Sequence, residues 1–392
     1  MGDTEHHTSV EVSNKLRNLI AACSAITVFG LAFGMTAPLL SLILQQRDIP
    51  ADMIGLNSAM MPVGILLFSP LIPALSMRFG ARNLAIIAAL STGALIICYK
   101  LFDSLSAWFI IRMLQGVSIS TLFVLSEAWI VGSASQANRG KVVAIYASVL
   151  SASFAGGPAL IGFIGIEGWT PFIIGAIAIA IGVIPITMIR DVAPAHQEEN
   201  SASGVFSFAF KAPMLVAAVG SFAIFDAATL SLWPVYGVEN GLSASAAAFA
   251  LTALIAGNIV LQIPIGWLAD KIPARSLMMW LAAITTIITA SIPWIIHSQL
   301  LWPALVIAGS TGYGVYTVSL KSLGDRFDGR DLIDGSATFS VMWGIGALLG
   351  SISGGWSVTW STTYGLPGML VMVYLLLFVG LYIRRNTVEK NQ

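Results

Sequence analysis

Residues Leu254–Arg275 read LIAGNIVLQIPIGWLADKIPAR, an apolar run that ends in a short loop with one acidic and two basic side chains. Residues Met61–Arg82 read MPVGILLFSPLIPALSMRFGAR and align with them without a gap, at an offset of 193 residues. Gly64 then meets Gly257, and the two stretches end on a shared arginine. A repeat of this kind, with an apolar segment leading into a basic loop both times, indicates two halves of parallel orientation.

Composition places these halves in a membrane. Of the 392 residues, 57% are hydrophobic and 10% are charged, whereas soluble domains carry about 25% charged residues. Twelve apolar segments recur, and most reach the ~20 residues that a helix needs to cross the hydrocarbon core. They are residues 19–44, 54–76, 83–101, 106–131, 142–165, 170–189, 213–237, 246–268, 276–296, 300–323, 335–358 and 363–383. We therefore predict an all-α polytopic membrane protein with twelve transmembrane helices in two parallel six-helix repeats.

The basic side chains indicate the orientation of the chain. Loops that the twelve spans place on one side carry Lys15, Arg17, Arg78, Arg82, Arg139, Lys141, Arg190, Lys211, Lys271, Arg275, Arg326, Arg330, Arg384, Arg385 and Lys390. The opposite loops carry only Arg47 and Lys100. Because cytoplasmic loops are enriched in lysine and arginine, we expect both termini to be cytoplasmic. The expected location is the inner membrane of a bacterium.

The longest polar stretch between two spans divides the chain into its halves. It occupies residues 190–212 and has the composition of a flexible linker on the cytoplasmic side. We expect a cytoplasmic tail over 1–18, a first six-helix bundle over 19–189, a second bundle over 213–383 and a cytoplasmic tail over 384–392.

Several functional classes lack their signatures. Net charge is zero, which gives no indication of a nucleic-acid partner, and both cysteines lie inside apolar runs. The chain has no Cys/His ligand spacing, no P-loop lysine pattern and no G-x-S-x-G elbow. We therefore expect no enzyme activity, no cofactor and no metal. The expected partners of this monomer are a small-molecule substrate, protons and membrane lipid.

The loop Gly266–Arg275 resembles the signature G-x-L-x-D-[RK]-x-G-x-[RK] of the major facilitator superfamily. The first-half copy, Pro73–Arg82, keeps the basic residues but has Met77 where the signature has aspartate. The resemblance implies two six-helix bundles, secondary transport by alternating access, and loops that act as cytoplasmic latches, with an aspartate-based latch only at Asp270. The gating candidates are Arg78, Arg82, Arg139, Asp270, Lys271, Arg275 and Lys321.

Shorter motifs narrow the resemblance. Arg112–Gly116 resembles the R-x-x-x-G motif of proton-coupled members, and Gly157–Pro158 resembles the antiporter G-P motif, which favours efflux over uptake. Ser126–Trp129, Asn138–Lys141 and Leu261–Gly266 resemble the YcaD-like branch. Two alternatives to a proton-coupled exporter stay open. One is an uptake symporter or uniporter of a small metabolite, and the other is a non-transporting membrane sensor on the same scaffold.

Ionisable side chains inside apolar segments are costly, at about 2.5–3.5 kcal/mol each on insertion scales. Asp226 lies near the middle of residues 213–237 and is the leading proton-coupling candidate. Its alternative role is an internal ion pair or a hydrogen bond to a neighbouring helix. Arg112 lies about one turn into its segment, where it could snorkel to the interface or hold an anionic substrate.

Glu127 is the second proton-coupling candidate. It lies fifteen residues beyond Arg112, which is ~22 Å along a helix and close to the cytoplasmic end. Lys321 occupies nearly the corresponding place in the second half. One interpretation is a structural charge network with Arg139 or Arg326. The other is a Glu127–Lys321 pair that bridges the two halves in the outward-open state.

Polar and aromatic side chains of the central segments complete the candidate substrate site. Together with Arg112, the substrate-binding candidates are Gln115, Asn258, Gln262, Tyr313, Tyr316 and Trp343. Hydrogen bonding between helices is the alternative role of the amides, and anchoring at the membrane interface is that of the aromatic residues. These side chains do not distinguish a sugar from an organic acid, a drug or another metabolite.

Overall fold

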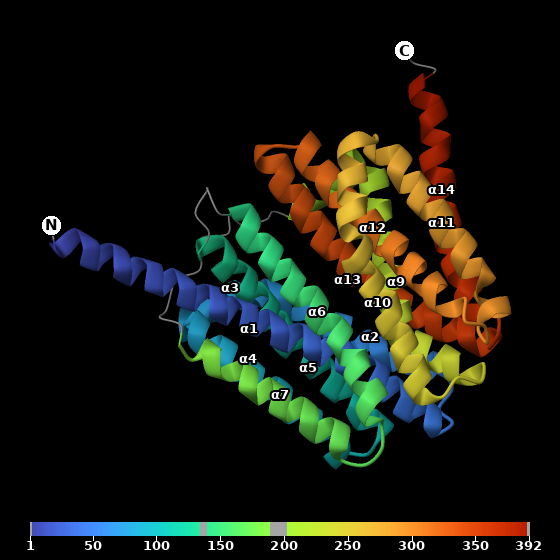
Figure 1. Cartoon of the computed structure of the whole chain (residues 1–392), viewed down its shortest axis with the longest axis horizontal. Coiled ribbons are helices and arrows are strands. Elements are labelled where there is room, and N and C mark those ends of the chain that lie inside the picture. The colour runs from blue at the N-terminus through green and yellow to red at the C-terminus, as the bar shows by residue number, and fades with distance from the viewer. Residues whose placement is uncertain (1, 134–138, 189–201, 390–392) are drawn as a thin grey trace. The chain divides into compact units, whose positions relative to one another are not determined.

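The computed structural model describes residues 2–133, 139–188 and 202–389, and all regular structure within these ranges is helical (Figure 1). The helices are α1 (Gly2–Gln46), α2 (Ala51–Phe68), the 3-10 turn η1 (Ser69–Leu71), α3 (Ile72–Phe79), α4 (Ala81–Leu101), α5 (Leu105–Ser133), α6 (Arg139–Ile164), α7 (Thr170–Ile186), α8 (Ala202–Lys211), α9 (Pro213–Glu239), α10 (Ala244–Lys271), α11 (Ala274–Ile295), α12 (Leu301–Arg326), α13 (Gly329–Trp360) and α14 (Gly365–Glu389).

Twelve of these segments correspond to the predicted spans. Among the described residues, ten stretches are long and apolar enough to cross a membrane, with α2, η1 and α3 counting as one. The eleventh, α7, is apolar but has only 17 residues. The twelfth, α12, has 26 residues, and its glycines, hydroxyl side chains and the charged residues of its last turns make it less apolar. The predicted all-helical fold is confirmed.

Some helices extend beyond their apolar segments. α1 begins at Gly2, so its first turns lie in the predicted tail 1–18, and α8 lies inside the predicted linker 190–212. A helix satisfies its own backbone groups whether its side chains are polar or apolar, so apolar runs mark only its membrane-embedded part. α8 packs through Phe208, which meets the ring of Phe327 edge-on at 4.9 Å.

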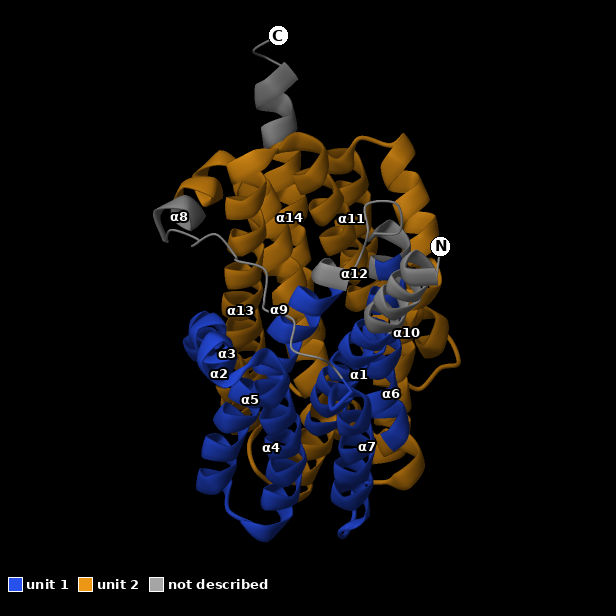
Figure 2. Cartoon of the chain, turned by 90° about the vertical axis from the view of Figure 1, so that its left-hand side faces the viewer, with its two compact units in different colours: residues 1–36, 63–160, 166–197 blue, residues 37–62, 161–165, 198–392 orange. Residues whose placement is uncertain are grey.

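Two compact units make up the chain (Figure 2). The first contains residues 1–36, 63–160 and 166–197, and the second contains residues 37–62, 161–165 and 198–392. The second unit thus includes the ends of α1 and α6 and the beginning of α2, together with α8–α14. Inside these three helices, the boundaries between units fall within a few residues of prolines, namely Pro38, Pro62 and Pro158. Proline removes a backbone hydrogen bond and bends a helix, so the prolines stand where these helices pass from one unit to the other.

The first unit has an aromatic core between α1, α5 and α6. Phe29 lies 5.1 Å from Phe123, and Phe33 lies 5.1 Å from Phe154, measured between ring centroids. α1 and α6 approach closely beside this cluster because Gly34 and Gly157 leave no side chain between the two backbones. On the other side of the unit, α4 packs against both α5 and α7.

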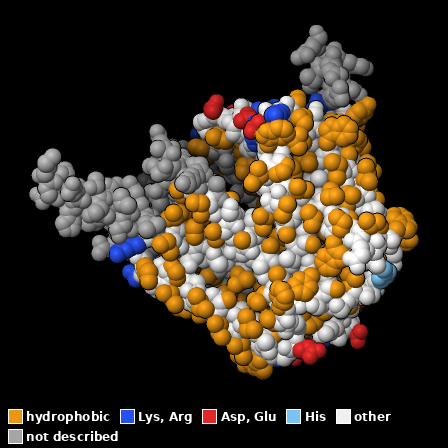
Figure 3. All heavy atoms as spheres, viewed as in Figure 1, with side chains coloured by type: hydrophobic (Ala, Val, Ile, Leu, Met, Phe, Trp, Pro, Cys, Tyr) orange, Lys and Arg blue, Asp and Glu red, His pale blue; other side chains and the backbone are white. Residues whose placement is uncertain are grey.

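The second unit is organised around α9, which packs against α10, α12, α13 and α14 and is buried from Leu215 to Gly237 along most of its length. α10 and α12 form another close pair, in which Ser310 Oγ donates a hydrogen bond of 2.6 Å to the carbonyl oxygen of Gly257. On the face shown in Figure 3, charged side chains of this unit gather at its two ends, and hydrophobic side chains cover much of the surface between them.

Close packing of α10 against α12 gives the first testable prediction. A Cβ at Gly309 would overlap the backbone of Leu254, whereas a Cβ at Gly324, further along α12, would meet nothing within 4 Å. Gly309→Ala should therefore cost about 1–3 kcal/mol or more through overpacking. Gly324→Ala should be neutral or stabilising, because alanine is the better helix former.

Thermal unfolding of the purified protein in detergent measures both variants. We expect a clear fall in Tm for G309A and no fall for G324A. Equal Tm values for the two variants would contradict the close α10–α12 contact.

Candidate functional site

Asp226 lies in the middle of α9, within the second unit, and its side chain is buried, with 4% of its surface exposed. The hydroxyl of Tyr313, on α12, donates a hydrogen bond of 2.7 Å to Oδ1 of Asp226. The side chain of Trp343, on α13, also hydrogen-bonds to the carboxyl group. Asp226 therefore connects three helices. Its two neutral hydrogen-bond donors offset part of the cost of burying a carboxylate away from water.

Aromatic rings of α9, α12 and α14 pack against one another around Tyr313, the tyrosine that donates to this carboxyl group. Phe222 stacks on Tyr316 at 4.6 Å and meets Tyr313 at 5.6 Å, measured between ring centroids. Phe225 contacts Tyr313 and Tyr374 edge-on, at 5.8 and 5.6 Å. Tyr316 and Trp343 remain partly exposed, unlike Asp226. The site thus combines a buried carboxyl group with aromatic side chains that are partly exposed.

Arg112 forms a second polar cluster, in the first unit. It lies on α5 with 1% of its surface exposed, and Gln115, one turn further along the same face, is fully buried. The hydroxyl of Tyr99, on α4, donates a hydrogen bond of 2.8 Å to Oε1 of Gln115. Trp108 covers the cluster from the start of α5, and its ring nitrogen donates to the carbonyl oxygen of Tyr99 at 3.0 Å. Burial shows that Arg112 does not snorkel to an interface in this structure.

Lys321 and Asp270, two gating candidates, lie close together in the second unit. Nζ of Lys321 is 2.6 Å from Asp325, one turn along α12, and 3.4 Å from Asp270 at the end of α10. These side chains are partly exposed, so the pairs contribute little to stability by themselves. They connect the end of α10 to α12. The predicted pair of Lys321 with Glu127 in the outward-open state joins the two halves of the chain and stays a prediction.

Arg275 and Lys271 have partners within their own unit. Arg275, at the start of α11, donates through Nε to the carbonyl oxygen of Leu381 on α14 at 2.9 Å, and Nη2 donates to the same oxygen. The ammonium group of Lys271 lies 3.6 Å from the ring centroid of Trp267, a distance at which a cation is attracted to the ring face. At the end of the loop that carries the sequence signature, Arg275 therefore attaches α11 to α14.

In the first unit, the corresponding loop is more open. Arg78 is exposed and lies 5.5 Å from the ring centroid of Phe79, and Arg82 is half-buried. The side chain of Arg139, at the start of α6, lies outside the described residues. Glu127, on α5, is exposed, and the neighbouring Ser126 hydrogen-bonds to the hydroxyl of Tyr146 at 2.8 Å.

The two remaining candidates lie on α10, away from the Asp226 carboxyl contacts. Gln262 is exposed and donates a hydrogen bond of 2.9 Å to the hydroxyl of Thr317 on α12, as the helix–helix alternative predicts. Asn258 is half-buried. Of the predicted site residues, the structure therefore brings together Asp226, Tyr313, Trp343 and Tyr316 in one unit, and Arg112 and Gln115 in the other.

The sequence analysis missed several side chains at these sites. Tyr99 was not a candidate, because a tyrosine near the end of a span resembles an interfacial anchor. Phe222 and Tyr374 were overlooked because apolar rings in apolar helices carry no distinguishing signal. Gln45 and Glu239 were also missed, although a hydrogen bond of 3.1 Å joins their side chains within the second unit. That pair connects the end of α1 to the end of α9.

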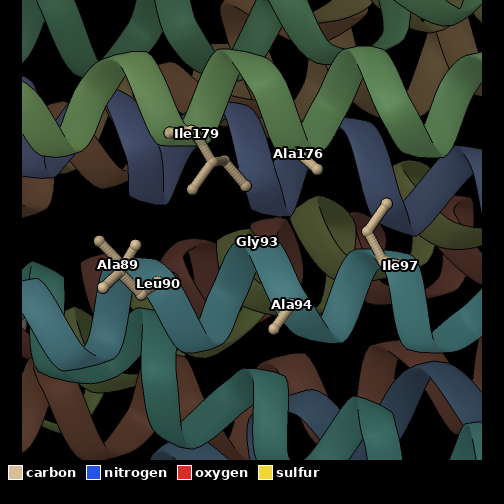
Figure 4. A pocket seen from close by; sticks show the side chains of 8 residues that line it. Ala89, Leu90, Gly93, Ala94, Ile97, Ala176 and Ile179 are labelled. Carbon is tan, nitrogen blue, oxygen red and sulfur yellow. The ribbon is translucent and has the colours of Figure 1, made fainter.

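A shallow groove between α4 and α7 is a further hollow of the first unit (Figure 4). Its lining consists of Ala89, Leu90, Gly93, Ala94, Ile97, Ala176, Ile179 and Ala180. It therefore lacks the few polar groups that orient a solute in a binding site, and we do not place the substrate there. Among the described residues, no group of three or more His, Cys, Asp or Glu side chains is arranged to hold a metal ion.

The described part of the chain has ten stretches long and apolar enough to cross a membrane, and each of its two units holds a buried polar cluster. These features are typical of polytopic membrane transport proteins. The sequence model of the Major Facilitator Superfamily matches residues 22–320 and, in a second match, residues 224–392. The chain belongs to this superfamily, as its loop signature indicated, and it is a secondary transporter of a small solute.

Similar proteins agree with this assignment. The chain is 24% identical to the uncharacterized MFS-type transporter YfkF of Bacillus subtilis (strain 168), over 84% of this chain and 86% of that protein. It is 25% identical to the uncharacterized MFS-type transporter YcaD of Escherichia fergusonii, over 85% of this chain and 87% of that protein. These relatives confirm the YcaD-like resemblance.

Solved structures agree on the fold. The nucleoside transporter NupG superposes with a TM-score of 0.74 over 94% of this chain and 98% of that chain, at 13% identity. A bacterial homolog of the human lysosomal transporter Spinster, in an inward-facing and unoccupied conformation, gives a TM-score of 0.76 over 94% of this chain and 95% of that chain, at 13% identity. At such identities the likeness concerns the fold alone.

The contact between Tyr313 and Asp226 gives the second prediction. Tyr313 and Tyr374 are both buried against Phe225, but Tyr313 donates to a carboxylate, whereas Tyr374 donates to the carbonyl oxygen of Gly312 at 3.0 Å. Hydrogen bonds to charged groups are worth about 1.5–3 kcal/mol, and neutral ones about 1 kcal/mol. Tyr313→Phe should therefore lower stability more than the matched variant Tyr374→Phe.

Thermal unfolding in detergent at neutral pH compares the two. A larger fall in Tm for Y374F than for Y313F would show that the Asp226 carboxyl group does not depend on the Tyr313 hydroxyl.

Proposed function

We propose that this protein is a proton-coupled secondary transporter that works by alternating access and exports its solute, with Asp226 as the residue that binds the coupling proton. The single observation that carries the proposal is a carboxyl group buried in the middle of α9 and hydrogen-bonded from two other helices. Buried ionisable residues inside membrane segments mark proton relays and ion pathways in transporters.

Protonation of Asp226 would change its contacts with α12 and α13. A carboxylate accepts the hydrogen bonds of Tyr313 and Trp343 as charge-assisted bonds, which are about twice as strong as neutral ones. A protonated carboxyl group accepts them more weakly and has a proton of its own to donate. Uptake of a proton would thus loosen α9 from its two neighbours, which couples the charge of the site to the packing of the unit.

The loops with the superfamily signature are the proposed latches on the cytoplasmic side. In the second half, the cluster of Asp270, Lys321 and Asp325 joins the end of α10 to α12, and Arg275 joins α11 to α14. Exposed pairs of this kind are weak enough to break and re-form during a transport cycle. We assign the same role to Arg78, Arg82 and Arg139 in the first half and to Lys271 in the second.

Export is the proposed direction because of Gly157–Pro158. Gly157 lets α6 contact the backbone of α1 at Gly34 and Met35, and Pro158, one residue later, removes a backbone hydrogen-bond donor inside α6. This packing supports the antiporter motif that the sequence resembles. We further propose that the protein works as a monomer in the inner membrane of a bacterium, with both termini cytoplasmic, as the lysine and arginine distribution predicts.

Transport in proteoliposomes tests the coupling and gives the third prediction. A thermal-shift screen of anionic, neutral and cationic solutes first identifies a ligand, since ligands of the folded state stabilise it. A pH gradient should then drive that solute across the membrane against the flow of protons. Asp226→Asn should reduce the gradient-driven flux to the level of empty liposomes, because the amide neither binds nor releases the proton.

Glu167→Gln is the matched control, because Glu167 is an exposed carboxylate in the loop before α7. We expect E167Q to transport as the unmodified protein does. Undiminished gradient-driven flux in D226N would remove Asp226 from the mechanism. Movement of solute together with protons would replace export by uptake, and flux indifferent to the gradient would indicate a uniporter.

A further inference from the structure

Arg112 has hydrogen-bond donors that the protein leaves unused. Nε and Nη2 of its guanidinium group are both buried, and among the described residues neither has a hydrogen-bond partner. None of the ion pairs between described residues includes Arg112 either. Arginine remains protonated in proteins, so the described part of the first unit holds a buried cation without a protein counterion. An unpaired buried charge is costly, which calls for a compensating partner.

The two unused donors lie on the same edge of the guanidinium group. The N–H groups of Nε and Nη2 point in parallel, at the spacing of the two oxygens of a carboxylate. Donors on different edges of an arginine would suit separate acceptors, whereas this edge suits one group with two oxygens in a plane. The geometry of the edge therefore matches a carboxylate or a similar oxyanion.

Gln115 contributes a third donor on the same face of α5. The Tyr99 hydroxyl donates to Oε1 of Gln115, so the oxygen of the amide is occupied and its orientation is fixed. Nε2 of Gln115 is buried and has no hydrogen-bond partner in the described part of the chain. Arg112 and Gln115 lie three residues apart on α5, which places both side chains on one face of the helix. Three unused donors thus belong to two side chains on one face of α5, and the acceptor of Gln115 is already paired.

We propose that Arg112 and Gln115 bind an oxyanion of the transported solute, with a carboxylate held by Nε and Nη2 of Arg112 and a third hydrogen bond from Nε2 of Gln115. The inference rests on the proposed function and names the substrate class as an organic anion. Tyr99 is a positioning residue, because it fixes the amide of Gln115 without donating to the solute. A phosphate or sulfonate group shares the chemistry and is separated from a carboxylate by the test below.

Asp226 is not the binding site for the solute in this proposal. Its carboxyl group would attract a solute amine, but it already accepts hydrogen bonds from Tyr313 and Trp343. A solute amine would have to displace them. At Arg112 no such competition exists, since the unused groups are all donors. In this proposal the cluster around Asp226 binds the coupling proton, and the cluster around Arg112 binds the anionic group of the solute.

Binding to the purified full-length protein in detergent tests the proposal without any need for transport. Thermal unfolding is followed with sodium benzoate, lactate, succinate, glutamate and citrate, with glycerol phosphate and ethanesulfonate, and with benzamide and choline chloride, at matched sodium and chloride concentrations. We expect one or more of the carboxylates to raise Tm by several degrees and the neutral amide and the cation to have no effect. Stabilisation by phosphate or sulfonate alone would move the assignment to that oxyanion.

Variants then locate the binding site. Arg112→Lys keeps the charge but loses the two-pronged edge, and should weaken binding of the stabilising anion roughly 10- to 100-fold, the equivalent of charge-assisted hydrogen bonds worth about 1.5–3 kcal/mol. Gln115→Leu should weaken it less. Tyr99→Phe frees the amide to rotate and should weaken binding while leaving the charge intact. The matched control is Arg17→Lys, since Arg17 is exposed near the start of the first span.

Three outcomes would overturn the inference. These are stabilisation by none of the anions, stabilisation only by the neutral or cationic compounds, and an anion affinity that is equal in R112K, R17K and the unmodified protein. A folding defect in R112K is recognised by its gel-filtration profile, and Y99F and Q115L then carry the test. If anions bind but no gradient drives them, the site stands and the transport proposal fails. If a neutral solute is transported with protons, the transport proposal stands and the anion-binding site fails.

Discussion

Hydrocarbon offers no hydrogen-bond partner, and this constraint governs the whole structure. Each backbone donor and acceptor inside the membrane has to be paired within the chain, and a helix pairs them within each spanning segment. The same constraint moves lysine and arginine to the loops and makes every charge within a span costly. Asp226 meets the cost with donors from two neighbouring helices. Nε and Nη2 of Arg112 have no such partner among the described residues. Because of this difference, we assign the coupling proton to Asp226 and the solute anion to Arg112.

Close packing provides the framework in which these side chains are held. Without a hydrophobic force between helices in lipid, contact depends on small residues that let backbones approach. Gly309 and Gly257 do this between α12 and α10, and Gly34 and Gly157 do it between α1 and α6. Tyr313 lies four residues beyond Gly309 on α12, so the glycine contact fixes the helix from which the tyrosine reaches Asp226. Packing and the proposed proton site are thus parts of one arrangement.

The sequence predicted properties that depend on position along the chain. Hydropathy indicated the number of spans, and charge bias indicated their expected orientation. The place of Asp226 near the middle of its apolar segment indicated its depth in α9. The sequence could not predict which side chains meet across helices, because that depends on how the helices rotate and pack. Tyr313 is 87 residues from Asp226, and nothing local marks it as the donor. Lys321 shows the same limit, since its partner Asp270 lies on another helix, α10, and nothing local marks it as the partner.

Three helices, α1, α2 and α6, belong to both compact units and pass from one to the other close to Pro38, Pro62 and Pro158. The segment between Pro38 and Pro62 belongs to the second unit, where Gln45 bonds to Glu239 and the backbone amide of Asp52 donates to Thr359 at 2.9 Å. A proline leaves one carbonyl of its helix without its usual donor, so bending costs least there. The alternating access that we propose requires contacts at one end of the helices to persist while others change. Helices interrupted by proline at the unit boundaries satisfy that requirement without losing their membrane-spanning hydrogen bonds.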